Sequence, residues 1–141
     1  MLSQKARYAL HAAIHLARAE TRVPSAEIAQ AEGIPPKFLE QLLAELKRRG
    51  IVESRRGPSG GYVLARPANE ITFAQILRAV EGPLALAPCA RAAAPKRCDD
   101  CEDMESCAIR PILVAVRQTS ALLLEGMSLA EAAGGKKVSF G

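Results

Sequence analysis

Two short helical segments joined by a tight turn, with a glycine-rich loop directly after them, constrain this fold most strongly. Ser25 has the side chain of a good N-cap, so a helix is expected to begin there and to stop at Gly33. Pro35 and Pro36 then stand where proline is tolerated, at the start of a second helix that ends at Gly50. This pattern predicts a helix-turn-helix.

A β-hairpin is expected directly after these two helices. Residues 51–53 and 62–64 are strand-like runs, and glycine and proline punctuate the loop between them. A hairpin in this position is called a wing. Aromatic residues make up only 4% of the chain, whereas alanine, leucine and isoleucine are plentiful, which favours packed helices elsewhere. The predicted fold class is therefore mainly α with a small β-hairpin wing, a winged helix-turn-helix.

The first helix is predicted over residues 3–19 from the spacing of its apolar residues. His11 and His15 fall on the opposite face of this helix. Their spacing suits a metal site, but no third ligand accompanies them, so we interpret them as part of a solvated face. The predicted buried stripe consists of Ala6, Ala9, Leu10, Ala13, Ile14 and Ala17.

Capping signals mark the helix that follows the wing. Thr72 and Gln75 form a capping box, and Ile71 with Ile76 occupies the positions of a hydrophobic staple. A helix is therefore expected over residues 72–82.

A long helix is expected over residues 108–125, where apolar residues step by four and three, the spacing of a seam between helices. This spacing predicts that another helix packs along it. Ser128 and Glu131 form a second capping box, for a short helix that ends near Gly134. The seam consists of Ile109, Leu113, Val116, Ser120 and Leu123, and Ile112, Thr119 and Leu122 widen its apolar face.

Basic residues are concentrated in the second helix of the pair and in the hairpin. Residues 37–66 contain seven basic and three acidic residues, a surplus equal to the +4 net charge of the whole chain. The first turn of the helix is placed to reach base edges in a major groove, and the wing to enter a minor groove or grip phosphate. Each feature alone is ordinary for a surface, but their order predicts binding to double-stranded DNA. The predicted contact residues are Lys37, Glu40, Gln41, Arg55, Arg56, Ser59 and Gly60.

The four cysteines lie in a segment without helical periodicity. Cys98-x-x-Cys101 followed by Cys107, with Cys89 upstream, is a set of thiolates that suits an iron–sulfur cluster or tetrahedral zinc. Five acidic residues at positions 99–105 are expected to raise the thiol pKa values, which disfavours a simple thiol switch.

The chain shows no membrane-spanning stretch and no signal-peptide cleavage site, so we expect a cytoplasmic protein, whose thiols stay reduced. We predict four parts: a winged helix-turn-helix DNA-binding domain over 1–82, a cysteine-rich sensor loop over 83–107, a dimerisation helix with a short C-terminal helix over 108–134, and a flexible tail over 135–141.

Two other classes of function fit the sequence less well. A thiol oxidoreductase would place Cys98-x-x-Cys101 at a helix start near a βαβ pattern, and neither feature is visible. A protein-interaction module built on the long helix would leave the basic wing unexplained. We therefore expect a protein that is not an enzyme.

Three segments carry a resemblance to a known family: Gln4–Leu10, Phe38–Leu42 and Arg55–Tyr62, of which the last contains the wing motif R-G-P-x-G-G-Y. The chain resembles the IscR/NsrR-type family of bacterial winged-helix regulators over nearly its whole length. The resemblance implies a dimer joined by a long helix after the cysteine loop. It also matches Glu40 and Arg56 to residues that contact operator bases, while Lys37 stands where the iron–sulfur regulator has serine, which implies a different operator sequence.

The resemblance also bears on the ligand set. Cys89, Cys101 and Cys107 match the three loop cysteines of the family's cluster-binding members. The histidine that completes the cluster in one member falls on Arg110, and the aspartate used by the nitric-oxide sensor falls on Arg7, and neither arginine can serve as a ligand. We therefore hypothesise that Cys98 supplies the fourth ligand.

The sequence as a whole predicts a DNA-binding transcription regulator, expected to act as a repressor, whose operator binding is modulated by an iron–sulfur cluster on the loop cysteines. The alternative is the same regulator with structural zinc, or with a thiol or small-ligand switch.

Overall fold

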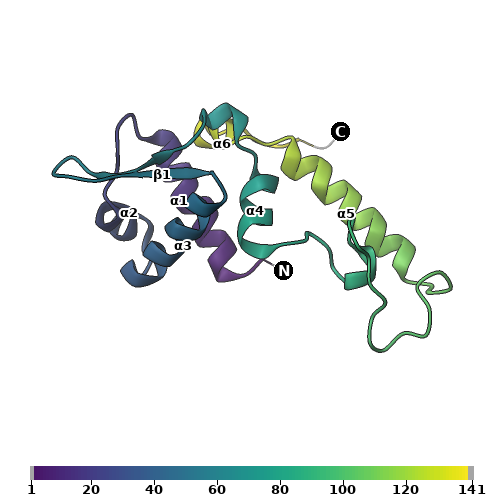
Figure 1. Ribbon diagram of the computed structural model, residues 1–141. Coiled ribbons are helices and arrows are strands. Elements are labelled where there is room, and N and C mark those ends of the chain that lie inside the picture. The colour runs from purple at the N-terminus through teal and green to yellow at the C-terminus, as the bar shows by residue number, and fades with distance from the viewer. Residues whose placement is uncertain (1, 140–141) are drawn as a thin grey trace.

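The computed structural model describes residues 2–139, which contain six α-helices and one two-stranded antiparallel sheet (Figure 1). The prediction of a mainly α fold with a hairpin wing is confirmed. Residues 140 and 141 of the predicted tail lie outside the described part. The helices are α1 (Gln4–Arg18), α2 (Ser25–Glu32), α3 (Pro36–Arg48), α4 (Phe73–Glu81), α5 (Arg110–Glu125) and α6 (Leu129–Ala133). The strands are β1 (Val52–Arg55) and β2 (Gly61–Leu64), and two short 3-10 turns are η1 (Ala68–Glu70) and η2 (Pro88–Ala90).

Helices α2 and α3 form the predicted helix-turn-helix. Gly33 ends α2 in the left-handed conformation, with φ of 65°, and Pro36 begins α3 at a position that has no need of a backbone N–H donor. The predicted N-cap is wrong by one residue, because Pro24 takes the cap position and Ser25 is already helical. The leucine stripe of α3 is buried as expected, at Leu39, Leu42, Leu43 and Leu46.

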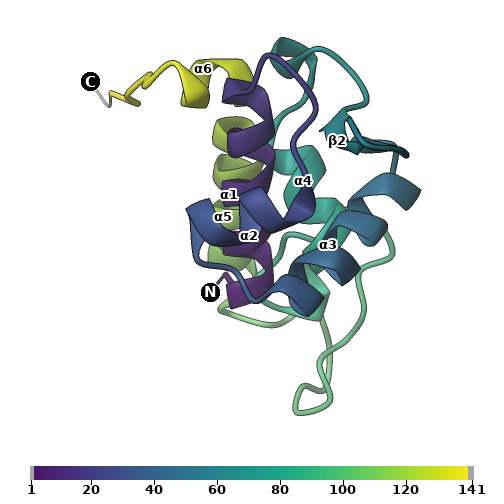
Figure 2. The ribbon, with the colours of Figure 1, turned by 90° about the vertical axis from the view of Figure 1, so that its left-hand side faces the viewer.

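Helix α1 runs through the middle of the folded body and is covered by α4 and α6 as well as by α2 (Figure 2). Its buried residues are Ala6, Ala9, Ala12, Ala13 and Leu16, so the buried stripe is turned relative to the prediction. Leu10, Ile14 and Ala17 are only partly buried. The small alanine side chains allow α4 and α6 to pack closely against α1. The apolar spacing of α1 alone does not identify the side on which they pack.

The wing is tied to the segment between α1 and α2. Val23 and Tyr62 exchange two backbone hydrogen bonds of 3.0 and 2.8 Å, which add a bridge to the β1–β2 ladder. This bridge needs a glycine at position 61, because a Cβ atom there would lie 2.5 Å from the carbonyl oxygen of Val23.

Helix α4 is the junction of the molecule and packs against α1, α3 and α5. Its predicted capping box is present, since Thr72 accepts from the Gln75 backbone and Gln75 accepts from the Thr72 backbone. The chain returns to this point after α5: Phe73 donates to the Met127 carbonyl and Leu129 donates to the Ile71 carbonyl. In the second predicted capping box, Ser128 accepts from the backbone N–H of Glu131.

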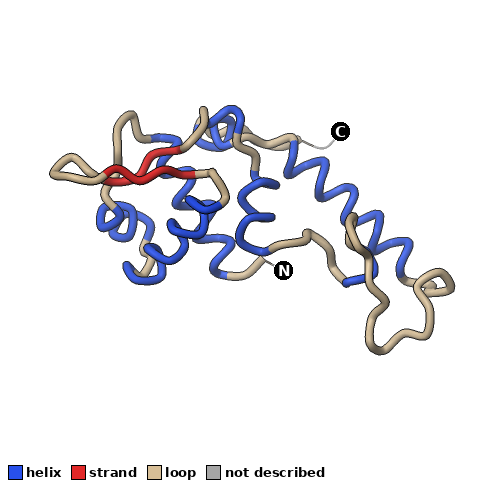
Figure 3. Tube along the Cα trace, viewed as in Figure 1, coloured by secondary structure: helices blue, strands red, loops and turns tan. Residues whose placement is uncertain are grey.

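Helix α5 projects from the folded body, and the cysteine loop lies beside the N-terminal end of this helix (Figures 1 and 3). It begins at Arg110, two residues later than predicted. Within the described residues, no helix combines the length and the apolar character needed to cross a membrane.

Candidate DNA-binding surface and cysteine loop

The outward face of α3 carries the three polar residues predicted to contact bases. Lys37, Glu40 and Gln41 are all exposed, because the leucines on the other side of the helix face the core. Helices α2 and α3 and the hairpin lie at one end of the molecule, as Figures 1 and 2 show. The first turn of α3 is therefore free to enter a groove.

The basic hairpin is joined directly to α3. The Lys47 ammonium donates to the Ser54 hydroxyl at 2.7 Å, which links the last turn of the helix to β1. Arg55 and Arg56 are exposed at the end of this strand, and Arg55 contacts the Glu53 carboxylate at 3.3 Å. The helix and the hairpin thus present polar and basic groups as one connected surface.

The loop of the wing is a tight glycine turn. Gly60 donates its N–H to the Gly57 carbonyl at 2.9 Å, and a Cβ at position 60 would lie 2.6 Å from the carbonyl oxygen of Arg55. Ser59 is exposed at the tip. A loop built this way is compact and lets another backbone approach closely.

Two contacts from α1 hold α3 in place, and sequence reasoning did not identify them. The Tyr8 ring meets the exposed Phe38 ring edge to face, with centroids 5.7 Å apart. Lys5 forms an ion pair with Glu45 at 2.8 Å. Lys5, Tyr8 and Phe38 belong to the segments that carry the family resemblance, but these contacts form only in the folded chain.

The cysteine loop is anchored by Cys89. This residue is buried in η2, which packs against α5, and Arg110 of α5 donates through its Nε to the Cys89 carbonyl at 3.0 Å. The segment that shows no helical periodicity in the sequence therefore contains one short helical turn, η2. Cys98, Cys101 and Cys107 are half-buried and, like Cys89, are free thiols.

The thiols of Cys98 and Cys101 lie close together. Their sulfur atoms and a carboxylate oxygen of Asp100 all lie within 4.8 Å of one another. The Cys101 N–H donates to the Cys98 carbonyl at 3.1 Å, and Arg97 donates to the carbonyls of both cysteines. Cys89 and Cys107 lie outside this tight group.

The cysteines nevertheless influence one another. The pKa of Cys101 is raised to about 11, first by burial, then by the charge of Asp100 and by Cys98 and Cys107. The pKa of Cys89 is also raised, by burial, by a hydrogen bond and charge from Cys98 and by the charge of Cys107, against a lowering by Arg110. A bound cation would relieve this repulsion, so the donor set fits a metal centre.

Asp100 is the residue of this group that sequence reasoning treated only as a negative charge. The Asp100 carboxylate lies 3.9 Å from the Cys101 sulfur, close enough to act as an additional oxygen donor. Its position between the two cysteines of the C-x-x-C pair was the available signal.

Comparisons with known proteins decide the family. The profile of the Rrf2 family, described as iron-dependent transcriptional regulators, matches residues 2–134. The chain belongs to the Rrf2 family. An rrf2-like HTH-type regulator from Rhodobacter capsulatus is 38% identical over 134 residues, which cover 92% of this chain and 89% of that one. IscR from Cereibacter sphaeroides is 46% identical over 84 residues, 57% of this chain and 54% of its own.

Solved structures agree with this assignment. CymR, the global cysteine regulator of Bacillus subtilis, superposes on this Rrf2 chain with a TM-score of 0.78 at 29% identity, covering 97% of this chain and 98% of its own. IscR from T. potens gives a TM-score of 0.76 at 25% identity, with coverage of 100% and 93%. This Rrf2 protein is therefore a DNA-binding transcriptional regulator of the winged-helix type and not an enzyme.

Proposed function

We propose that this Rrf2 protein is a homodimeric repressor that binds a partly palindromic operator, and that a metal centre on its cysteine loop modulates this binding. The observation that carries the proposal is the connected surface of α3 and the wing, which projects Lys37, Glu40, Gln41, Arg55 and Arg56 outward at one end of the molecule.

The first turn of α3 reads bases in the major groove in this proposal. Lys37 is suited to guanine, Gln41 to adenine and Glu40 to the amino group of cytosine. Arg55 and Arg56 bind phosphate or enter the adjacent minor groove, and the tight turn at Ser59 and Gly60 allows close approach to the sugar–phosphate backbone.

The second copy of the chain covers the free face of α5. Ile109 and Ile112 are 63% and 62% exposed, and Val116 and Leu123 continue the same stripe. A seam of this spacing fits a parallel or antiparallel helix of equal length. The exposed stripe is turned from the predicted one, because Leu113 and Ser120 face the body of the chain and Ile112 and Leu122 face outward.

Cys89, Cys98, Cys101 and Cys107 would hold an iron–sulfur cluster. When bound, such a cluster supplies a redox-active centre that oxidants can alter or remove. The thiols must lose their protons to bind it, and the raised pKa values of Cys89 and Cys101 keep these two thiols protonated at neutral pH in the metal-free loop. Zinc on the same thiolates is the alternative that the donor set also fits.

Helix α4 connects the loop to the DNA surface. Arg110 ties α5 to η2, Arg78 of α4 pairs with Glu125 of α5 at 2.6 Å, and α4 packs against α3. A change in the loop that shifts α5 thus reaches α3 through packed helices. Metal occupancy would favour one of two relative orientations of the DNA-binding surfaces in the dimer.

Selection of duplexes from a randomised library, with protein purified without oxygen, tests this proposal. We expect enrichment of a partly palindromic site, and an affinity for it that changes when the metal is removed at fixed salt. If no duplex is enriched at low salt in any metal state, the DNA-binding proposal fails. If a site is enriched but the protein binds it with the same affinity with and without the metal, only the sensor role of the loop fails.

A further inference from the structure

A cavity between α3, α4 and α5 is lined by three arginines and takes no part in the proposed function. Arg49 is the C-cap of α3, Arg78 lies in the last turn of α4, and Arg117 belongs to α5. The cavity has a volume of about 390 Å³, and no acidic residue within positions 2–139 lines it. It thus combines positive charge with a wall of apolar side chains, which are those of Pro83, Leu84, Ala92, Ala93 and Ala121.

Arg117 carries a buried nitrogen atom, Nε, that has no hydrogen-bond partner among residues 2–139. None of the ion pairs within these residues uses Arg117 or Arg49. Arg78 does have a partner, because it pairs with Glu125 at 2.6 Å. A buried donor of a charged group is costly when it stays unpaired, so an acceptor bound in the cavity would be stabilised there.

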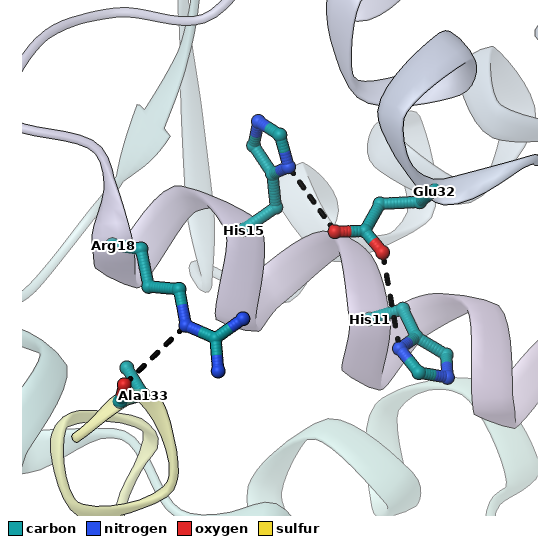
Figure 4. A network of polar contacts seen from close by, with 5 residues as sticks. All are labelled: His11, His15, Arg18, Glu32 and Ala133. Atoms are coloured by element: carbon teal, nitrogen blue, oxygen red, sulfur yellow. Dashed lines mark hydrogen bonds and ion pairs between the residues drawn. The ribbon is translucent and has the colours of Figure 1, made fainter. Parts of the chain in front are cut away.

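A polar cluster of α1 and α2, in contrast, is matched by partners within the chain. The Nδ1 atom of His15 lies 3.2 Å from one carboxylate oxygen of Glu32, and that of His11 lies 3.9 Å from the other oxygen. Arg18 donates to the Ala133 carbonyl at 3.3 Å (Figure 4). The interpretation of a solvated face holds for His11, which is 64% exposed, and is wrong for His15, which is 20% exposed against Glu32. This cluster gives no indication of a ligand.

The chemistry of the arginine cavity indicates the class of molecule that it would take. A guanidinium group binds a carboxylate through two parallel N–H donors. Ligand sites span roughly 300–1,000 Å³, so a cavity of about 390 Å³ suits a small organic molecule with a hydrocarbon part. Helices α3 and α4 end at this cavity, at Arg49 and Gly82, and their partial negative charge disfavours a doubly charged phosphate.

We propose that this cavity binds a small organic monocarboxylate, whose carboxylate accepts from Arg117 and Arg49 and whose hydrocarbon part lies against Leu84 and the alanines. The site joins the end of the helix-turn-helix, the end of α4, the cysteine loop at Ala92 and Ala93, and α5. A bound carboxylate would therefore hold α5 against α3 and α4. Its consequence for DNA binding rests on the proposed function, whereas binding of the carboxylate itself does not.

Calorimetric titration of the full-length protein with butanoate, hexanoate and octanoate tests the proposal. We expect binding at one site per chain, no binding of the uncharged analogue hexanamide, and no competition by inorganic phosphate. Arg117→Gln should weaken carboxylate binding by about tenfold or more, and Arg49→Gln, at an exposed position, should weaken it as well. Arg48→Gln removes the same charge from the neighbouring exposed position, which does not line the cavity, and should leave binding unchanged.

The effect on DNA is measured separately, by the affinity for a selected duplex with and without hexanoate. We expect this affinity to change in the wild type and to stay constant in Arg117→Gln. Carboxylate binding without a change in DNA affinity would remove only the regulatory consequence. Failure of all three carboxylates to bind, or equal binding by hexanamide, by phosphate or in Arg117→Gln, would overturn the proposal and leave the arginines as counter-charges to the C-terminal ends of α3 and α4.

Discussion

The two arginines at the end of β1 differ in how much of their charge is available to DNA. Arg55 shares its charge with Glu53, 3.3 Å away, whereas Arg56 is exposed where the strand passes into the loop. An exposed guanidinium in this position can bind phosphate or a base edge without first breaking an ion pair. We therefore expect Arg56 to be the stronger of these two proposed DNA contacts.

Arg56→Ala should weaken operator binding by about 1–3 kcal/mol, because one charge-assisted contact is lost. Fluorescence anisotropy on a selected operator at fixed salt measures this change. Lys137→Ala, which removes one positive charge from the exposed C-terminal segment, should leave the affinity nearly unchanged. Equal affinities of wild type and Arg56→Ala would remove the wing from the interface.

Cys101 should be a slow nucleophile in the metal-free protein. Its pKa of about 11 reduces the thiolate fraction at pH 8 far below that of an ordinary cysteine, and the higher intrinsic reactivity of the thiolate compensates only in part. We expect alkylation by iodoacetamide about tenfold slower than in the unfolded chain, as measured by mass spectrometry of the Cys101 peptide.

The pH profile of the same reaction gives the sign of the effect. Because folding raises the pKa, the rate should keep rising as the pH increases toward about 11 instead of levelling near 9. Asp100→Asn removes a negative charge that raises this pKa and should speed the reaction at pH 8. A rate that levels near pH 9 would contradict the assigned environment.

At the scale of elements, the wing depends on its contact with the segment before α2. Gly61→Ala should destabilise the protein by about 1–3 kcal/mol, because the new methyl group would overlap the Val23 carbonyl and displace the hairpin. Chemical denaturation followed by circular dichroism measures this loss. Ser59→Ala, at the exposed tip of the same loop, is the matched control and should have little effect on stability. An unchanged stability of Gly61→Ala would show that the hairpin can shift freely.

Local signals in the sequence were sufficient for most elements of this fold. The Thr72–Gln75 capping box, the terminating Gly33 and the leucine stripe of α3 were predictable because each depends on residues within one or two turns. The orientation of α1 and α5 was not, because it depends on which helices pack against them. The contact between Glu32 and His15 was not predictable for the same reason, since it joins residues 17 positions apart.

The same distinction between local signals and contacts made by the fold applies to the candidate sites. The positions of the four cysteines and of the polar residues on α3 could be read from spacing, and the structure exposes Lys37, Glu40 and Gln41 as expected. Spacing did not show that Cys98 and Cys101 come together with Asp100 while Cys89 is buried against α5. Those facts depend on the path of the loop over the long helix.

At the scale of the whole molecule, the exposed stripe of α5 predicts a dimer. Ile112→Glu combined with Val116→Glu places two charges in this stripe and should convert the protein to monomers, because a desolvated, unpaired charge is costly. Sedimentation velocity measures the change in mass. Gln118→Glu adds a charge on the same helix away from the stripe and should leave the dimer intact. A double variant that remains dimeric would place the interface elsewhere.

The DNA-binding surface and the cysteine loop lie toward opposite ends of the molecule, with α4 between them (Figure 1). In the proposed function, the state of the loop would therefore reach the DNA-binding surface by movement of packed helices and not by direct contact. This route requires that the cysteine loop holds a metal centre, as proposed above.

Absorbance spectroscopy with iron, sulfide and zinc analysis, on protein purified without oxygen, tests this claim most directly. We predict a coloured protein with matching iron and sulfide, and a loss of both when Cys98→Ser removes the proposed fourth ligand. A colourless protein with zinc bound by the loop would replace the cluster by the zinc alternative. Protein that holds neither metal on its cysteines, even after reconstitution, would contradict the account.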